Sequence, residues 1–184
     1  MNFNKHSDLT GRHAFLSPSS YHWVNYDDEK LDLTYRRMQA TERGTRLHAL
    51  AEELITLGIK LPRTKKTLNS FVNDAIGSKM ETEQVLAYSF NCFGTTDAIS
   101  FKNNLLRIHD LKTGVSPTSM KQLEVYTALF CLEYDVRPND IDIELRIYQN
   151  DEIIVHHPEK EDIMYIMDTI IRFDKKIESI KMEG

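Results

Sequence analysis

The sequence has no long apolar run, few cysteines and no flexible linker. No apolar stretch approaches the ~20 residues that a helix needs to span a bilayer. The polar N-terminus lacks the apolar segment of a signal peptide, so we expect a cytoplasmic protein. The two cysteines, Cys92 and Cys131, are too few for a four-thiolate cluster or a disulfide framework, which predicts reduced thiols. With no repeat and no Gly-, Pro- or Ser-rich tract, the 184 residues are predicted to form one domain.

The charge of the chain is negative overall but unevenly distributed. The net charge of −5 argues against a general nucleic-acid coat. Residues 36–66 carry a net charge of +5, whereas residues 133–184 carry −7. A basic N-terminal portion could therefore meet phosphate groups while the acidic portion faces solvent. The alternative is that both segments are ordinary solvated surfaces.

The hydrophobic pattern changes its period along the chain. Helical spacing predicts helices over about 33–57 and 68–76, and later over about 118–134 and from Pro158 onward. Short apolar segments bounded by turn residues predict strands at 84–90, 95–102, 105–111 and 141–148, with 152–155 as a further pairing segment. We expect an N-terminal arm at 1–32, a core at 33–148 and a C-terminal hairpin and helix at 149–184. The order predicts an α/β fold with a central mixed sheet of about four strands flanked by helices.

Asp97, Asp110 and Lys112 are the side chains most suited to catalysis. Residues two apart on a strand point to the same face, so Asp110 and Lys112 project together. Asp97 lies on the preceding predicted strand, across a tight turn, and can reach the same end of the sheet. Two carboxylates and the Leu111 carbonyl offer the hard oxygen ligands that Mg²⁺ or Mn²⁺ prefers. Taken alone, however, Asp110 and Lys112 are also what a surface ion pair would look like.

Two helical pairs could complete such a site. Gln122 and Tyr126 are four residues apart, as are His48 and Glu52, so each pair shares one helix face. Imidazole can bind Mn²⁺, and Glu52 could support it with a hydrogen bond. The alternatives are a core tyrosine and a structural histidine–glutamate pair.

In their order and spacing, these residues resemble the PD-(D/E)XK nuclease superfamily, and most closely its branch of RecB-like exonucleases and phage nucleases. The resemblance covers roughly residues 14–134. It rests on five motifs: Leu16-Ser17-Pro18-Ser19-Ser20, Gly44-Thr45-Arg46-Leu47-His48, Gly94-Thr95-Thr96-Asp97, Asp110-Leu111-Lys112-Thr113-Gly114 and Gln122-Leu123-Glu124-Val125-Tyr126.

The resemblance implies a restriction-endonuclease-like core and a deoxyribonuclease that depends on Mg²⁺ or Mn²⁺. It implies metal binding by His48, Asp97, Asp110 and the Leu111 carbonyl. Catalytic roles fall to Asp97, Asp110, Lys112, Gln122 and Tyr126. We expect DNA contacts from Ser17, Ser19, Arg43, Arg46 and Thr113.

The expected activity is that of a DNA exonuclease in recombination, repair or phage DNA metabolism. A non-cutting DNA- or protein-binding module and a restriction-type endonuclease stay open as alternatives. No iron–sulfur cluster is expected, because the chain lacks the four cysteines that many members of the branch use. It also lacks a phosphate-binding loop, so any helicase or recombinase partner would be a separate chain. A homo-oligomer is compatible with the resemblance, and a phage-encoded chain would act in the host cytoplasm.

Overall fold

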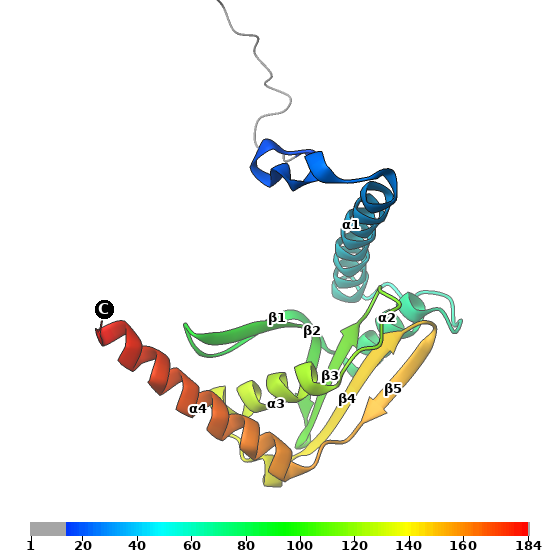
Figure 1. Cartoon of the computed structure of the whole chain (residues 1–184). Helices are drawn as coiled ribbons and strands as arrows, with labels where there is room; N and C mark the ends of the chain where they lie inside the picture. Colours follow the sequence, from blue (N-terminus) through cyan, green and yellow to red (C-terminus); the bar gives the residue numbers. More distant parts are fainter. Residues whose placement is uncertain (1–13, 184) are drawn as a thin grey trace, which may run out of the picture. The chain divides into compact units, whose positions relative to one another are not determined.

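The computed structural model describes residues 14–183 (Figure 1). The chain divides into two compact units, Met1–Arg43 and Gly44–Gly184, and the division falls inside helix α1 (Asp28–Thr56). Within residues 14–183, no helix is both long enough and apolar enough to cross a membrane.

The described part of the N-terminal unit consists of a 3-10 helix, η1 (Pro18–Asn25), and the first part of α1. The indole N–H of Trp23 donates a hydrogen bond to the Ser17 carbonyl (2.9 Å), which closes the turn over η1. Helix α1 begins earlier than the sequence pattern predicts, because the Asp27 carboxylate accepts a hydrogen bond from the Lys30 N–H (2.8 Å). An aspartate that caps a helix in this way starts it before any apolar periodicity is visible.

The C-terminal unit is built on one open mixed sheet in which five strands stand in sequence order. The strands are β1 (Glu81–Ser89), β2 (Cys92–Lys102), β3 (Leu105–Leu111), β4 (Asp142–Gln149) and β5 (Glu152–His156). Only β3 and β4 are parallel, and the other neighbours are antiparallel. The α/β prediction is confirmed. The sheet has five strands instead of the expected four, because β5 pairs with β4 along its whole length.

Tight turns explain why the β2–β3 and β4–β5 hairpins have sharp boundaries. Asn103 and Asn104 between β2 and β3, and Asn150 and Asp151 between β4 and β5, all adopt positive φ values of 50–60°. Two successive left-handed residues form the turn whose twist matches that of a β-hairpin, and Asn and Asp tolerate this conformation best.

Helices cover both faces of the sheet (Figure 1). Helix α3 (Lys121–Glu133) connects the parallel strands β3 and β4 and packs on one face together with α4 (Lys160–Glu183). Helix α2 (Thr67–Ser78) packs on the other face with the later part of α1. A short 3-10 helix, η2 (Pro138–Asp140), precedes β4.

The alternation along β3 determines which core each side chain joins. Leu106 and Ile108 enter the core beneath α3 and α4, whereas Leu111 enters the core beneath α2. Asp110 therefore lies on the α3 face and His109 on the α2 face, as the strand period predicts. This alternation determines which helix approaches each polar residue of β3.

Candidate functional site

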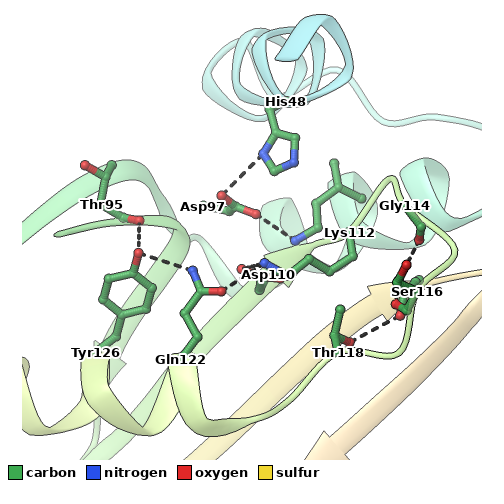
Figure 2. Close-up of polar contacts among 12 residues, drawn as sticks. His48, Thr95, Asp97, Asp110, Lys112, Gly114, Ser116, Thr118, Gln122 and Tyr126 are labelled. Carbon is green, nitrogen blue, oxygen red and sulfur yellow. Dashed lines mark hydrogen bonds and ion pairs between the residues drawn. The ribbon is translucent and has the colours of Figure 1, made fainter. Parts of the chain in front are cut away.

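Asp97 and Asp110 come from neighbouring antiparallel strands and share one face of the sheet. Ile99 of β2 pairs with Ile108 of β3, and each aspartate lies two residues from its isoleucine, toward the same end of the hairpin. Residues two apart share a face, so the two carboxylates point to the same side. Figure 2 shows them meeting beneath His48 and beside Lys112.

Asp97 is held by contacts to both of its carboxylate oxygens. Its Oδ2 accepts a hydrogen bond from the backbone N–H of Leu111 (2.7 Å), and its Oδ1 lies 3.3 Å from Nδ1 of His48. The N–H and C=O groups of one strand residue point in the same direction, so the Leu111 carbonyl also faces the Asp97 side. Two of the predicted ligands, Leu111 and His48, thus both adjoin the third, Asp97.

Asp110 is the most deeply buried acid of the group, with 7 % of its side chain exposed. Burial raises the pKa of its carboxyl, the neighbouring Asp97 raises it further, and Lys112 opposes both effects. Lys112 Nζ lies 3.1 Å from Oδ1 and 3.0 Å from Oδ2, but only Oδ1 has hydrogen-bond geometry. Asp110 Oδ2 is therefore buried without a hydrogen-bond partner among the described residues.

Lys112 is fixed between Asp110 and helix α3. Its ammonium group donates a hydrogen bond to Oε1 of Gln122 (3.0 Å), and Nε2 of Gln122 lies 3.4 Å from the hydroxyl of Tyr126. That hydroxyl in turn donates a hydrogen bond to the Thr95 carbonyl of β2 (2.6 Å). We expected both α3 residues to face the acids. Gln122 contacts the lysine, whereas Tyr126 supports Gln122 and anchors α3 to β2.

His48 reaches the site from α1, in the part of that helix that belongs to the C-terminal unit. Its hydrogen bond with Asp97 raises the pKa of the imidazole, and burial opposes this. Gly44, one turn earlier, is buried, and a Cβ there would lie only 2.7 Å from Oγ1 of Thr113. The absence of a side chain at Gly44 thus lets the helix approach the loop after β3 and brings His48 to the sheet.

Glu83 is a member of the group that the sequence analysis missed. A donor atom from each of His48, Glu83 and Asp97 can lie within 4.8 Å of the other two. Burial and the charge of Asp97 raise the pKa of the Glu83 carboxyl. Glu83 has a positive φ of 49°, and it interrupts the β1–β2 pairing between Thr82 and Gln84. A non-glycine residue in this conformation inside a strand is strained, and such strain often marks a functional position.

The remaining predicted residues lie outside this cluster of contacts. Glu52 is exposed, and its charge contributes to the raised pKa of Glu83. Among the described residues, Glu52 does not form the expected hydrogen bond with His48. Arg46 and Thr113 are exposed residues of the C-terminal unit, and Thr113 packs against Gly44. Ser17, Ser19 and Arg43 belong to the N-terminal unit, where the hydroxyls of Ser17 and Ser19 lie 2.8 Å apart. Their expected DNA contacts remain predictions.

The chemistry of these side chains suits a hard divalent cation. Three carboxylates and an imidazole gather near one end of the sheet, and the charge of Asp97 helps to raise the pKa of both Glu83 and Asp110. The buried Oδ2 of Asp110 has an ion-pair contact with Lys112 Nζ (3.0 Å) but no hydrogen-bond partner among the described residues, so it retains capacity to bind a cation. Oxygen donors with one imidazole are a set that Mg²⁺ tolerates and Mn²⁺ binds well.

Comparisons of the chain with protein-family models, with curated proteins and with solved structures found no match.

Proposed function

We propose that this protein is a metal-dependent nuclease that hydrolyses phosphodiester bonds in DNA. The observation that carries the proposal is the convergence of Asp97, Asp110 and Lys112 from β2, β3 and the residue that follows β3 (Figure 2). Two acids that can hold a cation, with an amine beside them, match what hydrolysis of a phosphodiester requires. The same residues carry the resemblance to the PD-(D/E)XK superfamily and its RecB-like and phage branch, so we assign the core to the restriction-endonuclease type.

In this proposal Asp97, Asp110, His48 and the Leu111 carbonyl hold Mg²⁺ or Mn²⁺, and Glu83 adds a further carboxylate. The bound cation would polarise the phosphoryl oxygen and favour ionisation of a nearby water. The acids need the cation for a second reason. Because they repel one another and Asp110 is buried, the group is less favourable without a positive charge at its centre.

Lys112 acts on the phosphate in this account. Its hydrogen bonds to Asp110 and Gln122 fix the ammonium group before the substrate binds. Little conformational entropy of the lysine side chain is therefore lost in the reaction step. From there it can orient the attacking water or stabilise the negative charge that develops on the phosphate. Gln122 holds the lysine, and Tyr126 holds Gln122, so both are assigned positioning roles.

The proposal assigns the protein an exonuclease activity in recombination, repair or phage DNA metabolism, and a cytoplasmic location. The two cysteines, Cys92 and Cys131, are free thiols, which suits a reducing compartment. A motor, where one is needed, would be a separate helicase or recombinase chain.

The test is degradation of DNA by the purified full chain. With Mg²⁺ or Mn²⁺ we expect linear DNA to be degraded, and EDTA to stop the reaction. Lys112→Met keeps the length of the side chain but removes its charge, and it should lower the rate by about 10²–10³-fold. Lys102→Met is the matched control, because Lys102 is exposed at the other end of the β2–β3 hairpin.

The substrate also separates the open alternatives. Degradation of linear but not of closed circular DNA would identify an exonuclease. Cleavage of both would favour a restriction-type endonuclease. If single- and double-stranded DNA, linear and circular, all survive with either metal, the nuclease proposal is wrong. A non-cutting binding module would then replace it.

A further inference from the structure

Strand β5 ends the sheet, and one side of its backbone has no partner. It pairs only with β4, and no other described strand lies beyond it. Its three central residues are apolar and exposed: Ile153 by 41 %, Ile154 by 46 % and Val155 by 48 %. An exposed apolar edge strand readily pairs with another strand, and proteins that remain monomeric usually protect such edges.

The turn before β5 determines which backbone groups are free. Gln149 and Glu152 flank the two-residue turn and therefore form a hydrogen-bonded pair. Hydrogen-bonded and non-hydrogen-bonded pairs alternate along an antiparallel ladder. Ile154 and His156 thus also bond to β4, whereas the N–H and C=O groups of Ile153 and Val155 point outward.

The two edges of the sheet differ in how they are protected. At the opposite edge, β1 is interrupted by the left-handed Glu83 and again by a register shift between Ala87 and Ser89. Such irregularities discourage pairing with another strand. Strand β5 has a continuous register from Glu152 to His156 and contains neither lysine nor proline.

We propose that the free edge of β5 pairs with β5 of a second copy of this chain, antiparallel and centred on Ile154. In this register Ile154 meets its own counterpart. The outward groups of Ile153 and Val155 form hydrogen-bonded pairs with Val155 and Ile153 of the second copy. Opposite residues in a ladder lie on the same face, so Glu152 meets His156 across the interface, a carboxylate against an imidazole.

In this antiparallel register the sequence of β5 matches itself, with apolar residues opposite apolar residues and the carboxylate opposite the imidazole. This match is why we choose a second copy of the chain as the partner. His156 contacts Glu124 of α3 through Nε2 (3.2 Å), and its second ring nitrogen is the one that Glu152 would meet. A two-fold pairing of like edges closes at the dimer, whereas pairing β5 with the β1 edge would build a larger ring or an open fibre. The inference is independent of the proposed nuclease activity.

The first test is the oligomeric state of the full chain, measured by sedimentation velocity over a wide range of concentration. We expect a reversible dimer. Ile154→Lys would place two ammonium groups face to face at the two-fold axis, and it should weaken the dimer by about tenfold or more. Val85→Lys is the matched control, since Val85 is a β-branched residue on β1 that is 48 % exposed. A monomer at every concentration, or a dimer that Ile154→Lys leaves unchanged, would overturn the proposal.

The second test reads the register directly and does not depend on the stability of the lysine variant. In a non-hydrogen-bonded pair the two Cα atoms are about 4.5 Å apart, close enough for a disulfide. On a Cys92→Ser background, Ile154→Cys should form a covalent dimer under mild oxidation, whereas Ile153→Cys should not. The remaining native thiol, Cys131, is 1 % exposed and will not interfere. Absence of the Ile154→Cys cross-link in a folded protein would contradict the proposed register.

Discussion

At the residue scale, His109 and Asp110 are adjacent in sequence but lie in opposite cores. Both are buried, and burial disfavours the charged form of each, so it lowers the pKa of His109 and raises that of Asp110. Asp110 has Lys112 as a compensating partner. His109 instead contacts the hydroxyl of Tyr148 through Nδ1 (3.2 Å), and that hydroxyl donates a hydrogen bond to Asp74 (2.8 Å).

His109 should make the protein less stable as the pH falls. Burial and the nearby Arg146 lower the pKa of His109 to about 3 in the folded state, from its usual value of 6.5 in an unfolded chain. Between these values the unfolded chain binds the proton and the folded chain does not. This part of the stability is therefore complete above pH 6.5 and is lost toward pH 3. Between neutral pH and about pH 5.5 the loss should be about 1 kcal/mol.

The measurement is the free energy of unfolding from urea titrations at the two pH values. His109→Gln should lose this part of the pH dependence, and His22→Gln, at an exposed position of the N-terminal unit, should keep it. An unchanged pH dependence in His109→Gln would show that folding does not lower the pKa of His109.

Glu83 should contribute to metal affinity although the sequence pattern does not single it out. The register of β1 on β2 places Glu83 opposite Asp97, and nothing in the local sequence announces that register or the left-handed residue at this position. The predicted strand started at residue 84, so Glu83 stood outside it. By contrast, Asp97, Asp110 and Lys112 could be predicted, because strand alternation alone brings them to one face.

Glu83→Gln keeps the shape of the side chain and removes its charge. We expect Mn²⁺ affinity, measured by isothermal titration, to fall by about tenfold. Glu52→Gln, which changes a nearby acid outside the cluster, should have a smaller effect. Equal affinities in the wild type and in Glu83→Gln would exclude Glu83 as a ligand.

At the scale of elements, local chemistry determines how well the boundaries could be predicted. The bounds of β3 were predicted correctly, because Asn103 and Asn104 mark the turn before it. The predicted start of α1 was wrong, because the Asp27 cap lies before any apolar repeat. Strand β1 begins earlier than predicted, since Glu81, Thr82 and Glu83 include no apolar residue that would mark a strand. Within the N-terminal arm predicted at 1–32, residues Pro18–Asn25 form a 3-10 helix, η1.

The contact between β2 and α3 depends on a glycine. A Cβ at Gly94 would lie 2.9 Å from Cε1 of the Tyr126 ring. Gly94→Ala should therefore displace Tyr126 from Thr95 and cost about 1–3 kcal/mol of unfolding free energy. Tyr126→Phe, which removes only the hydrogen bond, should cost about 1 kcal/mol.

A double-mutant cycle isolates this contact. In a Tyr126→Ala background the ring is gone, so Gly94→Ala should cost less than about 0.5 kcal/mol. Equal costs of Gly94→Ala in the two backgrounds would mean that the glycine is needed for a different reason, such as its backbone conformation.

At the scale of the whole molecule, the sheet order explains why the site forms where it does. The sequence predicts strands and helices in the right order. It does not show that β4 lies beside β3, because the α3 crossover could return the chain to either edge. The parallel pairing of β3 with β4 buries β3 at the centre of the sheet, and its end then carries Asp110 and Lys112 next to α3. Long-range pairing of this kind is encoded by packing rather than by local pattern.

The most direct test of the central claim is the position of Mn²⁺ in crystals of the protein, located by its anomalous scattering. We expect an ion in direct contact with carboxylate oxygens of Asp97 and Asp110, at about 2.1 Å as hard divalent cations require. An ion bound elsewhere, with those two carboxylates unligated at saturating Mn²⁺, would contradict it.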